Sequence, residues 1–164
     1  MRVPIRPFEP ARFAAFGASF ELPSEPGQRL GFCAELSNGR GTAALARLDA
    51  VLVAPVSLPI ALPRMERHPF SSQSFLPLDG AAYIVAVARE GADGGPDPAT
   101  LEAWQVPGSV AVTYHAGTWH APLAVPGRAG RFAVFMYTAG QDGHAGPGDE
   151  DWAELPPGIS LVPK

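Results

Sequence analysis

Proline and glycine interrupt this chain at short intervals, and this spacing excludes most architectures built on long helices. The sequence contains 19 prolines and 18 glycines among 164 residues, spread along the chain and not concentrated in one tract. Proline removes a backbone donor inside a helix, and glycine favours turns. Short apolar runs between such residues predict many short strands joined by turns.

Local patterns place these strands. We expect strands in "ASFEL" (18–22), near residues 32–36, and within the proline-interrupted apolar stretch 43–62. Residues 73–90 predict two strands joined by a hairpin turn at Asp79-Gly80, because Asp-Gly between apolar runs is a strong hairpin signal. Residues 108–123 predict strand, tight turn and strand, and residues 130–139 predict one more strand.

Little helix is expected. Residues 8–17 predict a short N-terminal helix that stops at Gly17, and Asp97 with Pro98 predicts one capped helical turn. The tail after residue 139 is expected to be mostly loop. A run of antiparallel strands of this length closes most naturally into a β-sandwich or a small barrel, so we expect one domain over residues 1–164.

Composition narrows the class of protein. Hydrophobic residues make up 46% of the chain and charged residues 17%, which indicates a globular protein with a real core. The net charge of −4, without a basic block, gives no electrostatic footprint for nucleic acid. No apolar run is long enough to span a membrane, and the N-terminal residues are not expected to act as a secretory signal. The single Cys33 forms no internal disulfide, so a cytoplasmic location is expected.

Polar side chains gather in one otherwise apolar region, with the spacing Glu66-x-His68-x4-Gln73-x6-Gly80. Residues two apart on a strand point to the same face, so Glu66 and His68 are expected to lie side by side. Gln73 returns toward them after a small loop. The three side chains are therefore predicted to meet inside a barrel.

A second region places His115 and His120 on either side of a glycine-containing turn. A single histidine is usually structural, and His144 in its glycine-rich stretch is expected to be solvated. Three of the four histidines nevertheless fall in these two regions, which favours a site. Carboxylate, imidazole and amide oxygen together suit nickel, manganese, iron or zinc.

These two regions resemble the two cupin motifs, with Glu66 and Gln73 as departures from the general pattern. The stretches "ERHPFSSQSFLPL" and "VTYHAGTWHAPL" are similar to the signatures of the ureidoglycolate lyase family. "FAAFGASFEL" and "GPDPATLEAW" are weaker matches to the same family. The resemblance covers most of residues 8 to 139.

The resemblance implies a mainly β fold: a cupin-type β-barrel (double-stranded β-helix or jelly roll) with a short N-terminal helix. It implies cleavage of (S)-ureidoglycolate to glyoxylate and urea in allantoin degradation. The implied cofactor is a divalent metal ion, with nickel favoured by the family and manganese or zinc as alternatives. A cytoplasmic homodimer acting on this small molecule is expected.

The resemblance also suggests roles for individual residues. His68, Gln73 and His120 are the expected metal ligands, and Glu66 is either a fourth ligand or the base that takes the hydroxyl proton. A salt bridge with Arg64 or Arg67 is the structural alternative for Glu66. His115 is the expected general acid, or else a residue that holds its turn. Tyr83 and Trp119 are expected to bind substrate, or else to pack in the core.

Two departures from the family bear on the substrate. Members commonly carry Asp-Arg where this chain has Tyr137 and Thr138, and an arginine that only Arg40 or Arg47 could replace here. Two further functions therefore stay open. One is an enzyme acting on another α-hydroxy or α-keto acid derivative, and the other is a cupin that binds a small carboxylate without catalysis.

Overall fold

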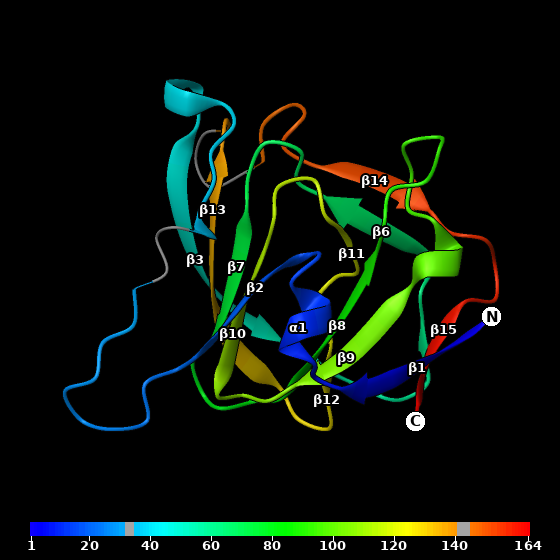
Figure 1. Cartoon of the computed structure of the whole chain (residues 1–164), viewed down its shortest axis with the longest axis horizontal. Coiled ribbons are helices and arrows are strands. Elements are labelled where there is room, and N and C mark those ends of the chain that lie inside the picture. The colour runs from blue at the N-terminus through cyan, green and yellow to red at the C-terminus, as the bar shows by residue number, and fades with distance from the viewer. Residues whose placement is uncertain (32–34, 141–144) are drawn as a thin grey trace.

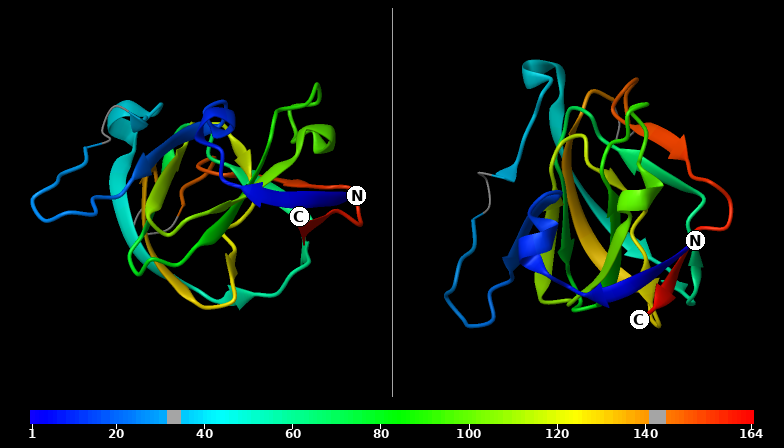
Figure 2. Two further views of the ribbon diagram at one scale, coloured as in Figure 1. Left: turned by 60° about the horizontal axis from the view of Figure 1, so that its bottom comes forward. Right: turned by 45° about the vertical axis from the view of Figure 1, so that its right-hand side comes forward.

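The computed structural model of the chain describes residues 1–31, 35–140 and 145–164. The chain is mainly β, and two curled sheets enclose an apolar interior (Figure 1). Figure 2 shows the curl of both sheets from two further directions. The short helix α1 (Pro10–Phe13) packs its buried Phe13 against the rings of Trp104 and Tyr114 in this interior.

The larger sheet has eight strands. Strand β1 runs parallel to both of its neighbours, and the other neighbouring strands are antiparallel. In spatial order the strands are β14 (Asp151–Glu154), β6 (Arg64–Arg67), β11 (Trp119–His120), β8 (Tyr83–Ala88), β9 (Glu102–Val106), β1 (Arg2–Pro7), β15 (Ser160–Pro163) and β5 (Ile60–Ala61).

The second sheet has five strands and is antiparallel throughout. Its spatial order is β2 (Gly17–Glu21), β10 (Val110–Tyr114), β7 (Gln73–Pro77), β13 (Gly130–Thr138) and β3 (Leu45–Val53). Outside the two sheets, β12 (Val125–Pro126) pairs with β4 (Pro55–Val56), and two short 3-10 turns are η2 (Gly41–Ala43) and η3 (Pro98–Thr100).

Strand β8 shows why the chain needs two layers of core. Its sequence YIVAVA is apolar at every position, and all six residues are buried. Tyr83 and Val85 face the interior between the sheets, whereas Ile84 and Ala86 belong to a second cluster on the opposite face of the larger sheet. Each fully buried large side chain contributes about 1.5–3 kcal/mol. The mainly β prediction is confirmed, and the architecture is consistent with a cupin-type barrel.

The predicted hairpin at Asp79-Gly80 is wrong. Strands β7 and β8 are both present, but they belong to different sheets, so the turn carries the chain from one sheet to the other. The Asp79 carboxylate accepts hydrogen bonds from the backbone N–H groups of Ala81 and Arg131. This contact ties the turn to the start of β13. The strand–turn–strand unit predicted for residues 108–123 contains both strands, but β10 and β11 also lie in different sheets.

Gly17 does not stop the helix as expected. The helix ends at Phe13, and Gly17 is the first residue of β2. A β-carbon at this position would lie 2.1 Å from the carbonyl oxygen of Thr113. Glycine is needed here because β2 and β10 approach so closely.

Within the tail, β14 and β15 are strands of the larger sheet that were not predicted, while the other described residues after 139 lie outside strands and helices, as expected. The strand at Arg2–Pro7 was also not predicted. Predicted strands in 18–22, 43–62 and 130–139 are confirmed, as is the Asp97 cap, whose carboxylate accepts from the Ala99 N–H. Most of the strand expected near residues 32–36, together with Cys33 and His144, lies outside the described residues.

Candidate metal centre

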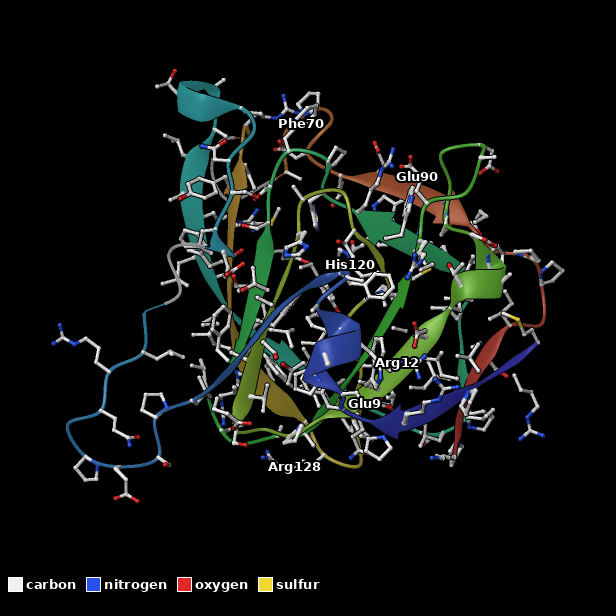
Figure 3. All side chains as sticks on the ribbon, in the orientation of Figure 1. Glu9, Arg12, Phe70, Glu90, His120 and Arg128 are labelled. Atoms are coloured by element: carbon white, nitrogen blue, oxygen red, sulfur yellow. The ribbon has the colours of Figure 1, made fainter. Side chains whose placement is uncertain are left out.

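Backbone register brings Glu66 and His120 together. Strands β6 and β11 are antiparallel, and His120 is the direct partner of Glu66. Opposite residues of an antiparallel ladder project to the same face. The Glu66 Oε1 atom lies 3.5 Å from His120 Nε2. Figure 3 shows His120 deep between the sheets, away from the exposed Phe70 and Glu90.

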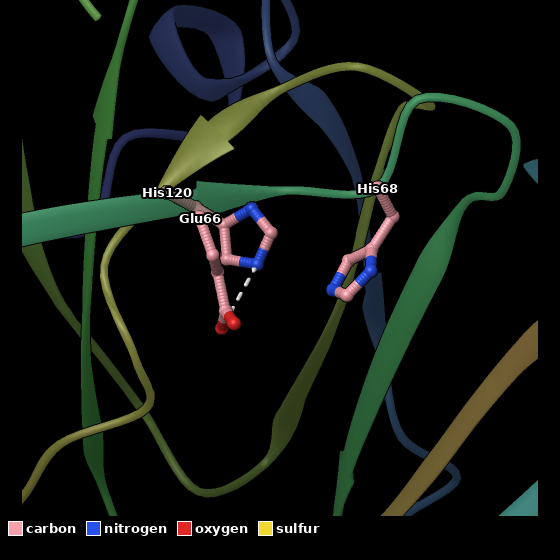
Figure 4. A group of neighbouring side chains, drawn as sticks. All are labelled: Glu66, His68 and His120. Carbon is pink, nitrogen blue, oxygen red and sulfur yellow. Dashed lines mark ion pairs between the residues drawn. The ribbon is translucent and has the colours of Figure 1, made fainter. Parts of the chain in front are cut away.

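His68 completes the group. It follows β6 directly and lies two residues after Glu66, so the predicted shared face is present. The centroids of the His68 and His120 rings are 5.5 Å apart. One ligand atom from each of Glu66, His68 and His120 lies within 4.8 Å of the others. Figure 4 shows these three side chains as one group.

Backbone carbonyls set the tautomer of both imidazoles. His120 Nδ1 lies 2.8 Å from the Thr118 carbonyl oxygen, and His68 Nδ1 lies 3.1 Å from that of Asp149. A carbonyl oxygen only accepts, so each Nδ1 carries the hydrogen and each Nε2 presents its lone pair. Both Nε2 atoms are buried and lack a hydrogen-bond partner in the described part of the chain. Imidazoles that ligate metals are oriented in this way.

The electrostatics of the group keep Glu66 charged and His68 neutral. Burial raises the pKa of Glu66, but its neighbours His120, His68 and Arg64 outweigh it and place this pKa below its ordinary value. Burial, followed by the neighbouring His120, lowers the pKa of His68. A charged carboxylate and a neutral imidazole are the forms that bind a cation.

Gln73 projects to the same interior. It is the register partner of Tyr114 on one side and of Met136 on the other. Its Nε2 lies 3.8 Å from the sulfur of Met136, while its Oε1 is buried and lacks a partner among the described residues. The amide oxygen is therefore a further donor atom without a protein partner.

Tyr114 is a site residue that the sequence did not single out. Its ring stacks on His120, with centroids 4.3 Å apart and planes 19° apart. Burial, assisted by the Glu66 carboxylate, raises the pKa of Tyr114 far above its ordinary value, so its hydroxyl stays protonated. Alternation along β10, with Val112 and Tyr114 on one face, was the available signal.

Three other predicted residues lie outside this group. His115 is exposed, and its backbone N–H donates to the Phe16 carbonyl oxygen in the turn before β11. Tyr83 is fully buried, and its hydroxyl donates to the carbonyl oxygen of Val110. Trp119 packs on the opposite face of the larger sheet from His120, with its indole N–H bonded to the Gly94 carbonyl oxygen.

The arginines near the site are already paired. Arg67 contacts Asp151 and Glu90 and lies over the Trp119 ring, so it does not bind Glu66. Arg40 Nε lies 3.2 Å from Asp149 Oδ1.

Arg47 Nε lies 2.7 Å from Asp49 Oδ2. Arg47 is the register partner of Met136, which in turn pairs with Gln73, so Arg47 shares the inner face. At the position of the departure, Thr138 is buried, while the Tyr137 ring packs against Phe135.

The donor set fits a divalent metal ion. Two unpartnered imidazole nitrogens are donors of borderline softness, while the charged carboxylate and the unpartnered amide oxygen are hard donors, and such a mixed set suits divalent first-row metals. The arrangement of curled sheets around an inward-facing group of this kind is consistent with the class of cupin-type barrel proteins.

Sequence comparison then identifies the family. The sequence model of ureidoglycolate lyase matches residues 1–156. The chain therefore belongs to the ureidoglycolate lyase family, a family of enzymes.

Individual relatives agree with this assignment. The chain is 36% identical over 141 residues to a protein of Agrobacterium fabrum named "Putative ureidoglycolate lyase", covering 86% of each chain. It is 42% identical over 80 residues to a ureidoglycolate lyase of Schizosaccharomyces pombe, covering 46% of this chain and 42% of that one. An Escherichia coli ureidoglycolate lyase is 42% identical over 69 residues, or 42% of each chain. No described helix is long and apolar enough to cross a membrane.

Proposed function

We propose that this protein cleaves (S)-ureidoglycolate to glyoxylate and urea with the help of a divalent metal ion. One observation carries the proposal: the unpartnered Nε2 atoms of His68 and His120 lie beside the Glu66 carboxylate. Family membership supports the substrate. His68, His120 and Gln73 are the proposed ligands, and nickel is the proposed metal, with manganese and zinc as alternatives.

The chemistry requires one proton removed and one delivered. A bound divalent ion supplies a positive centre that lowers the pKa of the substrate hydroxyl and attracts its carboxylate. Glu66 is the proposed base for the hydroxyl proton, because its lowered pKa keeps it ionised; coordination is its other possible role. As the C–N bond breaks, its electron pair goes to the urea nitrogen, which takes a proton, and the former hydroxyl carbon becomes the aldehyde of glyoxylate.

Two further residues are proposed to serve the leaving group. His115 is the proposed proton donor, acting from the exposed turn before β11. The protonated hydroxyl of Tyr114, which shares the interior with Glu66, is a proposed hydrogen-bond donor to substrate. Tyr83 and Trp119 are proposed only as supports of the site wall, because their polar atoms bond to backbone carbonyls.

A second enzymatic candidate is favoured by the paired arginines. Arg40 and Arg47 each contact a carboxylate of this chain, so neither offers an unengaged guanidinium to a substrate carboxylate. The substrate of this second candidate is another α-hydroxy or α-keto acid derivative.

We also propose a cytoplasmic homodimer joined through β3. Among the described residues this strand pairs with β13 alone, and Leu48 and Leu52 on it are 70% and 65% exposed. Open edges of this kind need covering. Antiparallel pairing with a second copy, centred on Leu48, would place Arg47 opposite Asp49 of that copy, so the strand is complementary in charge to itself.

The test of function is glyoxylate release from racemic ureidoglycolate. Protein stripped with a chelator is resupplied with nickel, manganese or zinc. Metal-dependent release from half of the substrate would support the lyase and its stereochemical preference. Protein that binds metal but releases nothing would sink the proposed substrate and favour the second candidate.

A further inference from the structure

A buried carboxylate outside the ligand group has no assigned role. The side chain of Asp149 is 2% exposed. Its Oδ2 accepts hydrogen bonds from the backbone N–H groups of Ala139, Gly140 and Gly146, at 2.8, 3.3 and 2.6 Å. Its Oδ1 pairs with Arg40. A buried charge is tolerated only with such partners, so this carboxylate fixes its own backbone in place.

The backbone of Asp149 reaches the metal centre although its side chain does not. Its carbonyl oxygen is the acceptor for His68 Nδ1, at 3.1 Å. This contact holds the hydrogen of the neutral ring on Nδ1 and leaves Nε2 free to bind a cation. The orientation of His68 therefore depends on where the Asp149 carbonyl is held.

Arg40 links this carboxylate to the segment that follows His68. Besides Asp149, the Arg40 guanidinium donates to the Pro147 carbonyl oxygen and lies 4.4 Å from the centroid of the Phe70 ring. The neighbouring Gly39 N–H donates to the Phe70 carbonyl oxygen. Three separate segments of the chain thus meet around one ion pair.

We infer that the Arg40–Asp149 pair is a positioning device that sets the tautomer and orientation of His68. Neither residue touches the proposed metal, so both act through His68. The inference rests on the ligand role of His68 proposed above. Loss of the pair would release the carbonyl, allow both tautomers of His68, and weaken cation binding by about 10-fold to 100-fold, as expected for an outer partner of a ligand.

The experiment compares the full-length protein with Asp149→Asn, which keeps the side-chain shape but removes its charge. The first readout is the imidazole 15N NMR spectrum of metal-free protein, with the His68 signals assigned by their loss in His68→Gln. The second is nickel affinity by calorimetry. Asp151→Asn is the matched control, because Asp151 is a more exposed acid paired with Arg67.

We expect Asp149→Asn to mix the two tautomers of His68 and to weaken nickel binding, while Asp151→Asn changes neither. Arg40→Gln removes the other, more exposed partner of the same ion pair. It is the second test variant if Asp149→Asn does not fold. Wild-type tautomer and affinity in the folded variants would overturn the inference. Wild-type protein that binds no metal would instead overturn the ligand role of His68, because the tautomer is measured without metal.

Discussion

Glu66 and His120 are direct partners across the β6–β11 ladder, and their side chains meet at 3.5 Å on the inner face. Two short strands, far apart in sequence, thus set the central contact of the site by register alone. A slip of one residue in either strand would send one of the two side chains to the opposite face. The site therefore depends on the ladder as much as on the residues themselves.

Glu66→Gln is expected to abolish most turnover. The amide keeps the shape of the side chain but cannot take a proton, so kcat should fall by about 100-fold to 10,000-fold. Metal affinity measured by calorimetry should change little if Glu66 is the base. A large loss of affinity would assign Glu66 as a ligand instead. Glu90→Gln, which alters an exposed carboxylate paired with Arg67, is the control.

Gln73→Leu is expected to weaken metal binding. The change removes the unpartnered amide oxygen while keeping a similar volume, so the affinity for nickel should fall by at least about tenfold. Gln105→Leu alters an exposed glutamine on β9 and should leave affinity unchanged. Equal affinities for both variants would remove Gln73 from the ligand set.

Tyr114→Phe is expected to separate catalysis from packing. The ring that stacks on His120 remains, so the fold and metal affinity should persist, while loss of the hydroxyl should lower kcat by about 100-fold. Tyr83→Phe is the matched control, because its hydroxyl bonds to a backbone carbonyl. That variant should lose about 1 kcal/mol of unfolding free energy and keep its kcat. Unchanged turnover in Tyr114→Phe would contradict the proposed donor.

Ionised Asp79 is expected to stabilise the fold, so the free energy of unfolding should fall when Asp79 becomes protonated at acid pH. Burial raises its pKa, but hydrogen bonds from Arg131 and Ala81 and the charge of Arg128 outweigh it, so the pKa lies below the ordinary 3.8. A depressed carboxyl pKa stabilises the fold above 3.8, and this stabilisation is lost as pH falls through the folded-state value. Urea unfolding should show Asp79→Asn less stable than wild type at pH 7, with the difference in stability closing as the pH falls below 3.8. A stability difference between the two proteins that stays constant with pH would contradict this role of the Asp79 carboxylate.

Leu48→Asp is expected to produce monomers. A charge at the centre of the proposed β3–β3 contact would face its own copy, so the mass by light scattering should fall from twice 17.2 kDa to that value. Leu78→Asp, at a leucine 57% exposed outside β3, should stay dimeric. A wild-type protein that is already monomeric at micromolar concentration would exclude the dimer.

Sequence patterns predicted strands well but not their partners. Alternation and turn residues located β7, β8, β10 and β13, because these signals are local. Asp79-Gly80 looked like a hairpin because a turn sequence does not say whether the next strand pairs with the last one. Here its carboxylate binds Arg131, far along the chain, and the turn changes sheets. The tail strand β15 was missed because its partner β1 lies at the other end of the sequence.

For the candidate site, too, local sequence patterns predicted some residues but not the contacts between distant segments. The shared face of Glu66 and His68 followed from strand periodicity, and the structure groups both with His120. The stacking of Tyr114 on His120 joins two sheets, so no local pattern predicts it. The roles given to Gln73 and His115 stay predictions. The hydrogen bond from His68 to the Asp149 carbonyl oxygen could not be predicted from the sequence. Every residue carries a backbone carbonyl, and only the fold determines which of them lies next to His68.

The parallel pairing of β1 with β15 has a consequence for biosynthesis. Residues 2 to 5 align with residues 160 to 163, so this ladder cannot form until almost the whole chain described here has left the ribosome. Until then, the edge of β1 that pairs with β15 stays open. Contacts between residues so far apart in the sequence form slowly, and folding intermediates that lack them are prone to aggregate. A nascent chain of this protein is therefore expected to need holding by chaperones until its last strand arrives.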